Sequence, residues 1–559
     1  MTPELVPSAV PHSRERWLVA ALAVVVAGGL FWPMPLHLTD ALVTSPTGEG
    51  PEHVWRWWVG AQVGRPWGGD FGGLNHPEGL SVHVIDPLNG LMARALGWWW
   101  GGPAAGHAVV QVAGIVVSAL AGHLLADETG ADRAGRILGA AAGMAIPTVV
   151  GAGIDGITEG LGLGWVGLQL GYLLRLVRTR CARDVVMSGL TLGAAAWSGP
   201  YTLVFSAMID VVVVVAVARR TWLPLLSSAF GAVLATPIIW SAFTLVDQAP
   251  GGAGRSAMER PPVVDAWRGA WREGADLVDL FVPSWITGEC ASAPTTGYLG
   301  LFWLLVVGWG AVRALKMERF GTVLPWLLGA VVFAVLALGP FVVVGGEVAT
   351  LGSAELWAPA AFLESVPILG RLSRWYRAAA VAVLLSIPVA GHVVRGRSSL
   401  LAAILGILVM MDARVGSPAP FPAPVVSIDT TDARGWSGAV AELPPVHPLG
   451  QQGVVADRNL LFQTQHGHAS SGTIEARSGA ASHHAGILVL ERVLRLEPAD
   501  SDALVESARR QLVADGFRTL LLYSDLLPEG AVPALSDRLG PGEEVSTGIW
   551  MVRLDAVTE

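Results

Sequence analysis

The sequence predicts a polytopic α-helical membrane protein with about eleven transmembrane helices and a small C-terminal α/β domain. Three observations lead to this prediction. Of 559 residues, 52% are hydrophobic and only 14% are charged, and the mean hydropathy is +0.52, which is unlike a soluble globular protein. Apolar stretches close to the roughly 20 residues that cross a bilayer recur along residues 1–411. The remaining residues have the composition of a soluble domain.

The predicted spans follow one another through mostly short polar connections. We place them near residues 17–36, 105–126, 135–151, 157–175, 184–198, 201–218, 222–245, 298–314, 322–344, 376–394 and 398–411. The boundary at Ser198-Gly199-Pro200 is the least secure, because a proline can kink one helix instead of separating two. Gly-rich runs such as residues 160–164 indicate close packing between helices.

The lysines and arginines of the connecting loops predict the orientation. They form clusters before the first span and after every second one: Arg14 and Arg16, Arg133 and Arg136, Arg175 to Arg183, Arg219 and Arg220, Arg313 to Arg319, and Arg395 and Arg397. All these clusters fall on one side of an eleven-span protein, and the positive-inside rule makes that side cytoplasmic. We therefore expect a cytoplasmic N-terminus, with the long loops 37–104, 246–297 and 345–375 and the tail on the external side.

The tail differs in character from the spans. Residues 412–430 contain GSPAPFPAPVV, which is typical of an extended linker. Within residues 431–559, SDALVESARRQLVADGF has the apolar spacing of an amphipathic helix, and TLLLY and GIWMVRL are typical of buried strands. The apolar face of that helix comprises Leu504, Val505, Ala508 and Leu512. We expect an external α/β domain that offers a surface for envelope protein partners.

The first external loop, residues 37–104, contains the densest group of ionisable residues. Glu49, Glu52 and His53 lie within five residues of one another, a combination suited to a proton-accepting base or to a divalent cation such as Mg²⁺ or Mn²⁺. The alternative is that these carboxylates are merely solvated and that the tryptophans after them lie at the membrane interface. Asp86 precedes an apolar helix, so we expect it to cap that helix, and it is also a candidate for substrate binding.

Two further external segments add candidates for substrate binding. Asp155 and Glu159 occupy the short turn between the third and fourth spans, and they would join the first loop if they face the same cavity. Arg371, Arg374 and Arg377 lie on the predicted external side, against the positive-inside trend. Guanidinium groups bind phosphates well, which favours an anionic ligand. The alternative is that these arginines reach lipid headgroups.

Several classes of function are disfavoured. The sequence has no P-loop, G-x-S-x-G, H-E-x-x-H or dinucleotide-binding motif, and no basic stripe for nucleic acid. The two cysteines have no metal-binding spacing, and the irregular spacing of the tail histidines favours surface or core roles over a metal site. A transporter is disfavoured because ionisable residues are scarce within the spans, with Asp210 and His123 as exceptions.

Four motifs follow one another in a characteristic order. They are Gly48-Glu49 with Trp55, Tyr298-Leu299-Gly300-Leu301, the arginines of residues 371–377, and Gln463-Thr464-Gln465-His466-Gly467. In this order and topology the chain resembles the GT-C superfamily of membrane glycosyltransferases, and in particular its bacterial members of unassigned activity. The resemblance implies a GT-C-like transmembrane domain over residues 1–411, with amphipathic helices in the loop 37–104.

The resemblance also implies a reaction. GT-C enzymes use a lipid-linked sugar donor, here a polyprenyl phosphate, and glycosylate an envelope acceptor at the external face of the bacterial cytoplasmic membrane. A carboxylate of the first external loop serves as base, and basic residues hold the lipid phosphate. Carried over, Glu49 takes the acidic position, Glu52 and His53 share its role, and Arg371 or Arg374 binds phosphate. The usual aspartate is a glutamate here, which moves the carboxylate by about an ångström. The alternative is a non-catalytic scaffold or assembly factor for envelope glycoconjugates.

Overall fold

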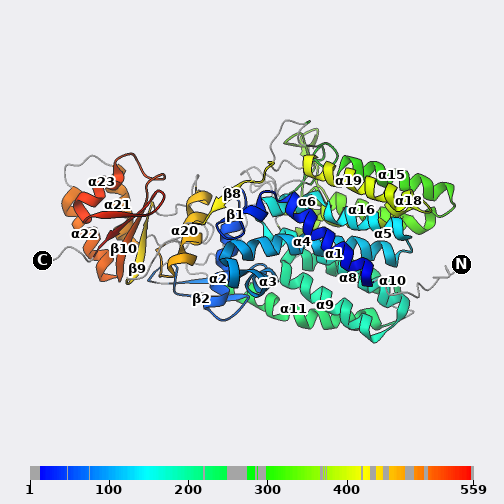
Figure 1. Cartoon of the computed structure of the whole chain (residues 1–559), viewed down its shortest axis with the longest axis horizontal. Helices are drawn as coiled ribbons and strands as arrows, with labels where there is room; N and C mark the ends of the chain where they lie inside the picture. Colours follow the sequence, from blue (N-terminus) through cyan, green and yellow to red (C-terminus); the bar gives the residue numbers. More distant parts are fainter. Residues whose placement is uncertain are drawn as a thin grey trace.

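The structure is a computed structural model of the chain. It describes residues 13–46, 48–74, 76–77, 79–217, 221–247, 274–283, 286, 297–364, 369, 372, 374–416, 420–428, 436–444, 452–471, 484–495 and 501–554. A long helical bundle continues at one end into a smaller domain that contains a sheet (Figure 1). The bundle contains α1 (Ser13–Leu30), α4 (Trp99–Glu128), α5 (Arg133–Met144), α6 (Pro147–Ile154), α8 (Gly164–Thr179), α9 (Ala182–Ser198), α10 (Pro200–Val217), α11 (Leu223–Asp247), α15 (Leu301–Lys316), α16 (Phe320–Ala337), α18 (Ala378–Val394) and α19 (Ser399–Gly416).

Eight helical segments among the described residues are long and apolar enough to cross a membrane. They are Pro87–Glu128, Arg133–Ile154, Thr158–Thr179, Pro200–Val217, Leu223–Ala242, Phe320–Ala337, Trp375–Val394 and Ser399–Gly416. Each coincides with one predicted span, so the prediction of a multi-pass, mostly helical membrane protein is confirmed. The count of eleven is not, because the other three predictions fall on α1, α9 and α15. Helix α1 begins with charged residues, and α9 and α15 have only 17 and 16 residues.

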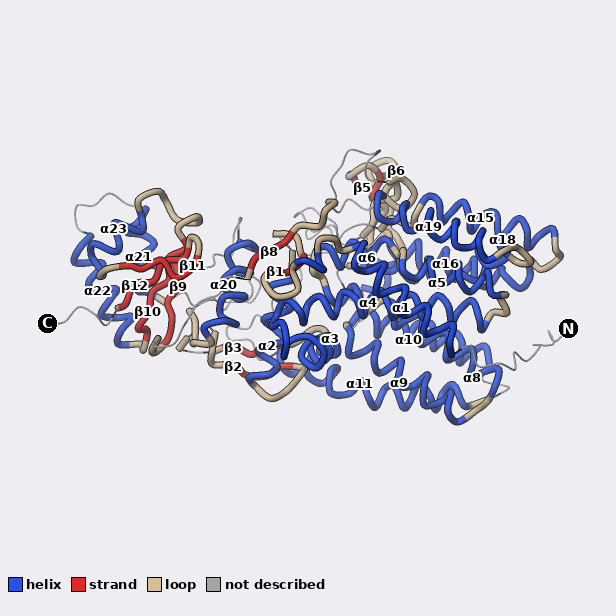
Figure 2. Tube along the Cα trace, in the orientation of Figure 1, coloured by secondary structure: helices blue, strands red, loops and turns tan. Residues whose placement is uncertain are grey.

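The distribution of apolar side chains fits a bilayer. Helix α18 is buried along its whole length, packed against α16, α15, α5 and α4, as expected for a helix that is apolar on all sides. Helices at the periphery expose large apolar residues instead, such as Val215 of α10 and Leu328 of α16. An exposed apolar surface of this kind is stable in contact with lipid. The bundle is therefore a helical membrane domain (Figure 2), and α18 is its buried helix.

The first long loop folds at the end of the bundle nearest the C-terminal domain (Figure 1). Its elements are η1 (Met34–Leu36), β1 (Ala41–Val43), α2 (Gly50–Gln62), the hairpin of β2 (Gly68–Phe71) and β3 (Leu80–His83), α3 (Pro87–Ala93) and the π-helical η2 (Arg94–Trp98). The helical segment that contains the second predicted span begins at Pro87, directly after Asp86 and earlier than the predicted start of the span near residue 105, and it runs into α4 with a kink at Gly102. The turn between α6 and α8 contains α7 (Thr158–Leu161). The third long loop contains β4 (Val343–Val344), β5 (Glu347–Val348), β6 (Thr350–Leu351), β7 (Ala354–Glu355), α17 (Ala360–Glu364) and η5 (Trp375–Arg377).

The boundary at Ser198-Gly199-Pro200 separates two helices. Helix α9 ends at Ser198 and α10 begins at Pro200, because Gly199 has a φ of 153°, which no helix accommodates. The predicted linker also differs from a free spacer. Helix α19 continues to Gly416, and β8 (Val425–Ser427) pairs antiparallel with β1, so this segment is anchored to the first long loop.

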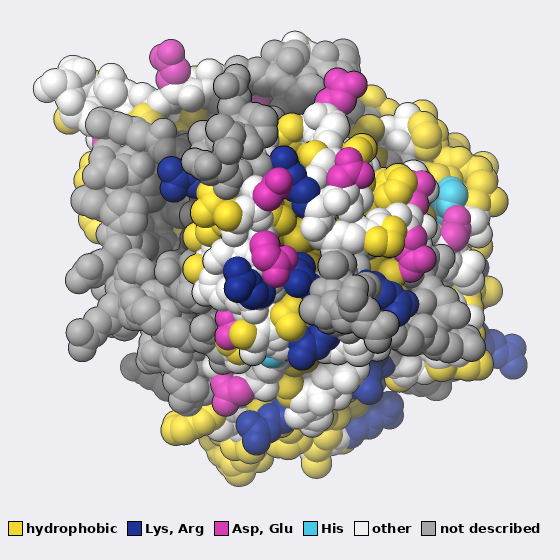
Figure 3. Space-filling model, turned by 90° about the vertical axis from the view of Figure 1, so that its left-hand side faces the viewer, with side chains coloured by type: hydrophobic (Ala, Val, Ile, Leu, Met, Phe, Trp, Pro, Cys, Tyr) yellow, Lys and Arg dark blue, Asp and Glu magenta, His cyan; other side chains and the backbone are white. Residues whose placement is uncertain are grey.

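The C-terminal domain contains a four-stranded sheet in the order β11-β12-β10-β9. Its elements are β9 (Ala439–Leu443), α20 (Gln452–His466), α21 (Ala485–Arg495), α22 (Ser501–Ala514), β10 (Phe517–Tyr523), α23 (Ala531–Leu539), β11 (Gly542–Ser546) and β12 (Ile549–Arg553). The predicted amphipathic helix is α22, which buries Val505, Ala508 and Leu512, whereas Leu504 is half exposed. Acidic and basic side chains alternate over the described part of this end of the molecule, without a basic stripe (Figure 3).

Glu442 is a buried carboxyl that joins the sheet to α20. It lies in β9 and bonds with Ser470 Oγ at 2.8 Å and with Asn459 Nδ2, in α20, at 3.3 Å. Burial raises the pKa of Glu442 to about 7, although these hydrogen bonds oppose the shift. The folded domain therefore retains a proton that the unfolded chain loses above its ordinary pKa of 4.5.

We predict that this proton makes the stability of the C-terminal domain pH-dependent. Because the folded-state pKa is raised, the contribution of this proton to the free energy of unfolding is complete below pH about 4.5. As the pH rises to about 7, the free energy of unfolding falls by up to about 3 kcal/mol. Glu442→Gln should flatten this dependence, whereas Glu543→Gln, at an exposed position of β11, should not. The check is the midpoint of thermal unfolding of the detergent-solubilised chain between pH 5 and pH 8. Equal slopes in the wild type and Glu442→Gln would contradict it.

Candidate functional site

Helix α2 presents different residues on its opposite faces. With 3.6 residues per turn, His53 and Trp57 lie on one face, next to Glu49 at the residue before the helix, and Trp55 and Val59 lie on the other. Trp57 belongs to the apolar core of the bundle and His53 pairs with Glu159 of α7, whereas Trp55 and Val59 pack under α20. The periodicity of this one helix therefore directs His53 into the membrane domain.

Two glycines allow the loops of the site to approach each other. A Cβ on Gly48 would lie 2.2 Å from the Asp155 carbonyl oxygen, to which the Glu49 amide donates a hydrogen bond of 3.2 Å. Gly156 has a φ of 76°, and a Cβ there would lie 2.6 Å from the Gly50 Cα. The start of α2 can therefore lie directly on the turn that leads into α7.

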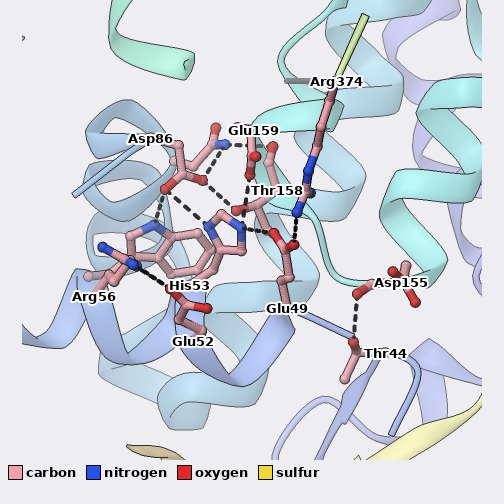
Figure 4. A network of polar contacts seen from close by, with 12 residues as sticks. Thr44, Glu49, Glu52, His53, Arg56, Asp86, Asp155, Thr158, Glu159 and Arg374 are labelled. Carbon is pink, nitrogen blue, oxygen red and sulfur yellow. Dashed lines mark hydrogen bonds and ion pairs between the residues drawn. The ribbon is translucent and has the colours of Figure 1, made fainter. Parts of the chain in front are cut away.

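His53 stands at the centre of three carboxylates from different segments (Figure 4). Its Nε2 lies 2.9 Å from Glu159 Oε2 of α7 and 3.7 Å from Glu49 Oε2, and its Nδ1 lies 3.4 Å from Asp86 Oδ1. Burial alone would lower the pKa of His53, but Asp86 and Glu159 raise it well above its ordinary value. Carboxylates on both ring nitrogens therefore favour the imidazolium form of His53.

Asp86 does not cap α3, and that prediction is wrong. It occupies the residue before the helix, but its carboxylate accepts no hydrogen bond from the first helical amides. It accepts instead from Trp57 Nε1 at 2.9 Å, from Asn89 Nδ2 at 3.0 Å and from the Thr158 hydroxyl. A buried carboxylate must be paired or hydrogen-bonded, and these donors together with His53 meet that need.

Two arginines neutralise the remaining carboxylates. Arg377 Nη2 pairs with Glu159 Oε1 at 2.9 Å, and its guanidinium lies 4.5 Å from the centre of the Tyr201 ring. Arg374 pairs with Glu49 Oε1, and its backbone amide donates to the Tyr201 hydroxyl at 2.8 Å. Three carboxylates thus face three cations, so the cluster is balanced in charge.

Solvent reaches only one part of this cluster. The side chains of Glu49 and Arg374 are 32% and 24% exposed, whereas those of His53, Glu159 and Arg377 are 3%, 7% and 1% exposed. Burial would raise the pKa of Glu49, but Arg374 and the hydrogen bond from His53 lower it to about 2. Glu49 is therefore an accessible carboxylate, ionised at neutral pH and supported by buried charges.

Three of these groups are arranged to hold a metal ion. One ligand atom each from Glu49, His53 and Glu159 lie within 4.8 Å of one another. Two carboxylates and an imidazole suit Mn²⁺ or Zn²⁺ better than Mg²⁺, which prefers oxygen ligands. Asp86 on the other ring nitrogen is the usual second partner of a metal-bound histidine. The donor set therefore fits a divalent cation that replaces the proton of His53.

The other predicted site residues lie outside this cluster. Glu52 accepts from Arg56 Nε at 2.7 Å, on a different face of α2 from His53 (Figure 4). Asp155 contributes its backbone carbonyl, which accepts from the Thr44 hydroxyl at 3.0 Å. Burial and the nearby Glu49 raise the pKa of its carboxyl to about 6. Arg371 lies outside the described residues.

Sequence reasoning missed the neutral members of the cluster. They are Trp57, Asn89, Thr158 and Tyr201, which position Asp86, Arg374 and Arg377. Thr158 directly precedes Glu159, and Tyr201 directly follows Gly199-Pro200. Threonine and tyrosine are common in helices, however, so these positions did not stand out. The only usable signal was the i, i+4 spacing of His53 and Trp57.

We predict that Arg377→Gln destabilises the protein strongly, because it leaves the buried Glu159 without its guanidinium partner. Breaking a buried pair from one side costs about 3–5 kcal/mol. The double variant Arg377→Gln/Glu159→Gln should be less destabilised than the sum of the two single variants. Thermal unfolding in detergent measures all four proteins, and strict additivity would show that the pair is not coupled.

No family model and no curated protein matches the sequence. The structure is similar to that of the arabinofuranosyltransferase AftD from mycobacteria, with a TM-score of 0.54 and 13% identity over 99% of this chain and 40% of that one. A point mutant of the same enzyme gives a TM-score of 0.52 and 13% identity over 98% and 42%. The oligosaccharyltransferase of Archaeoglobus fulgidus, in a complex with Zn and sulfate, gives a TM-score of 0.42 and 13% identity over 93% of this chain and 70% of that one. This chain thus spans about 40% of the length of AftD, and its fold is GT-C-like.

Proposed function

We propose that this chain is a membrane glycosyltransferase that transfers a sugar from a polyprenyl-phosphate donor to an acceptor of the bacterial cell envelope. The observation that carries the proposal is the Glu49–Arg374 pair. It joins a carboxylate to a guanidinium at the accessible edge of a cluster whose other charges are buried. A carboxylate suits the activation of a hydroxyl and a guanidinium suits a phosphate, so the pair matches the two ends of such a reaction.

The reaction follows from these two groups. An acceptor hydroxyl oxygen attacks the anomeric carbon of the donor sugar while Glu49 takes the hydroxyl proton. The bond from the anomeric carbon to the phosphate oxygen breaks, and polyprenyl phosphate leaves with the electron pair. Arg374 stabilises the charge that develops on the phosphate, and attack from the opposite side inverts the configuration at the anomeric carbon.

Because Glu49 pairs with Arg374, binding of the donor phosphate affects the strength of the base. In the free protein the guanidinium contributes to the low pKa of Glu49, which makes Glu49 a weak base. A bound phosphate draws Arg374 away from the carboxylate, so the pKa of Glu49 rises and the base strengthens. The buried His53 and Glu159–Arg377 groups hold Glu49 in position without contacting the substrate.

The direction of the site supports a reaction at the external face. Arg16 and Arg136, from the basic clusters predicted to be cytoplasmic, lie together at one end of the bundle, paired with Asp127 and Glu15. Helix α2 and the C-terminal domain lie at the other end (Figure 1). The positive-inside rule then orients the N-terminus to the cytoplasm and the site to the outside of the cytoplasmic membrane.

A divalent cation would be held by Glu49, His53 and Glu159, with Asp86 orienting the imidazole. When bound, it would supply positive charge for the phosphate of the donor. His53 would then act as a neutral ligand and not as a cation, and Arg377 would keep its pairing with the second oxygen of Glu159.

We predict that Glu49→Gln abolishes sugar transfer, with a decrease of at least about 10²-fold, because the amide cannot accept the hydroxyl proton. Glu52→Gln, which changes a carboxylate of the same helix that faces Arg56, should retain most of the transfer. The measurement is transfer from a polyprenyl-phosphate sugar in membranes that contain each variant. Full activity in Glu49→Gln would rule out Glu49 as the base, and a wild type inactive with every donor would favour the scaffold alternative.

We also predict saturable binding of Mn²⁺ to the purified chain, because two carboxylates and an imidazole converge on one position. Loss of one ligand in Glu49→Gln should weaken this binding about 10-fold or more, whereas Glu52→Gln should leave it intact. Electron paramagnetic resonance of free Mn²⁺ during a titration measures the affinity without any assay of transfer. Equal affinity in the wild type and Glu49→Gln would place the ion elsewhere.

A further inference from the structure

The back of α2 is covered by α20 of the C-terminal domain. Trp55 and Val59, which point away from the site, form an apolar cluster with Leu460 of α20 and with Leu74 and Val82 of the first long loop. Trp55 and Val59 are fully buried. A surface of α2 that would otherwise be exposed apolar area is therefore closed by a segment about 400 residues later in the chain.

One polar residue of α20 organises this contact. The side chain of Gln463 accepts a hydrogen bond from Trp55 Nε1 at 2.7 Å. Its amide nitrogen donates to the His468 carbonyl at 3.0 Å and to the Gly73 carbonyl. Gln463 is 1% exposed, so each of these bonds replaces contact with water that the groups have lost.

Backbone contacts connect the same two regions. The Ser470 amide donates to the Gly73 carbonyl at 2.9 Å, and the His76 amide donates to the Ser470 carbonyl at 3.0 Å. At the other end of the site loop, β8 pairs with β1, directly before the segment that contains Glu49. The segments that precede and follow α2 are thus both hydrogen-bonded to chain that follows α19.

The geometry of α2 makes these contacts relevant to the site. His53 and Trp55 are two residues apart, about 200° around the helix, so they lie on opposite faces. Trp57 Nε1 fixes the site face to Asp86 at 2.9 Å, and Trp55 Nε1 fixes the back face to Gln463. A rotation of α2 that broke the second bond would move His53 and Glu49 relative to Glu159 and Arg374.

We propose that Gln463 is a positioning residue of the site, and that α20 forms one working unit with the membrane domain by fixing the rotation of α2 through Trp55. In this view the C-terminal domain is more than a surface for partners. The claim that Gln463 fixes the rotation of α2 does not depend on which reaction the site performs. The expected effect of Gln463 on turnover rests on the proposed function.

The first test is hydrogen exchange of the full chain in detergent. Gln463→Leu removes the acceptor of Trp55 and leaves a buried indole N–H unpaired, so the amides of α2 should exchange about tenfold faster. Gln465→Leu is the matched control, because Gln465 belongs to the same helix but its amide bonds to the adjacent Thr464. Exchange in α22 should be unaffected by either variant, which excludes general unfolding. Unchanged exchange of α2 in Gln463→Leu would overturn the proposal.

A conservative variant separates positioning from simple packing. In Gln463→Glu, the protonated form of the new carboxyl group can accept from Trp55 and donate to a carbonyl, whereas the ionised form faces the carbonyls of Gly73 and His468. The exchange of α2 in Gln463→Glu should therefore be near that of the wild type at low pH and faster than that of the wild type at high pH, when the two proteins are compared at the same pH. A ratio of the two exchange rates that does not change with pH would mean that Gln463 acts only through its volume, and this would also overturn the proposal.

Kinetics distinguish this proposal from the proposed function. If both hold, Gln463→Leu lowers kcat about tenfold with little change in the KM for the lipid donor, because the chemical groups are displaced and not the donor contacts. If the wild type transfers no sugar while α2 loosens in Gln463→Leu, the proposed function fails and the positioning role stands. If kcat is unchanged although α2 loosens, then α20 does not position the site and the proposal fails.

Discussion

The need to pair buried charges governs how this site is assembled. A charge removed from water costs several kcal/mol unless opposite charges and hydrogen bonds compensate it. Glu159 and Asp86 are almost completely buried. Glu159 pairs with Arg377, and His53 pairs with both carboxylates. Because these partners come from four separate segments, their pairing holds α2, α3, α7 and the start of α18 together. The accessible Glu49–Arg374 pair rests on this buried arrangement.

Helix α2 transmits this constraint across the loop. Two of its three tryptophans, Trp55 and Trp57, lie only two positions apart, yet Trp57 donates to Asp86 in the membrane domain and Trp55 donates to Gln463 in α20. A third side of the helix is occupied by the Glu52–Arg56 pair. Contacts on three sides thus oppose rotation of the helix, so the position of His53 is set on both sides of α2. Preorganisation of this kind is what a catalytic carboxylate requires.

Hydropathy predicted the spans well because lipid contact imposes a strong and local signal on sequence. The sequence also pointed to most charged members of the cluster, since Glu49, His53, Glu159, Arg374 and Arg377 are conspicuous in the polar connections of an apolar chain. Their pairings were not predicted, because no local rule connects Glu159 with Arg377, which lie 218 positions apart in the sequence. The capping role expected of Asp86 failed for the same reason: a local preference of a helix end yielded to a distant histidine and a threonine.

The structure explains why a glutamate suits position 49 better than an aspartate would. The residue lies directly before α2, where an aspartate carboxylate tends to bond back to the first amides of the helix. Glu49 makes no such bond. Its longer side chain reaches Arg374 with one oxygen and lies 3.7 Å from His53 Nε2 with the other. The extra methylene therefore frees the carboxylate from the helix end and commits it to the site. A substitution that looks like a departure from an aspartate-based site is, in this geometry, compatible with the same use of the carboxylate.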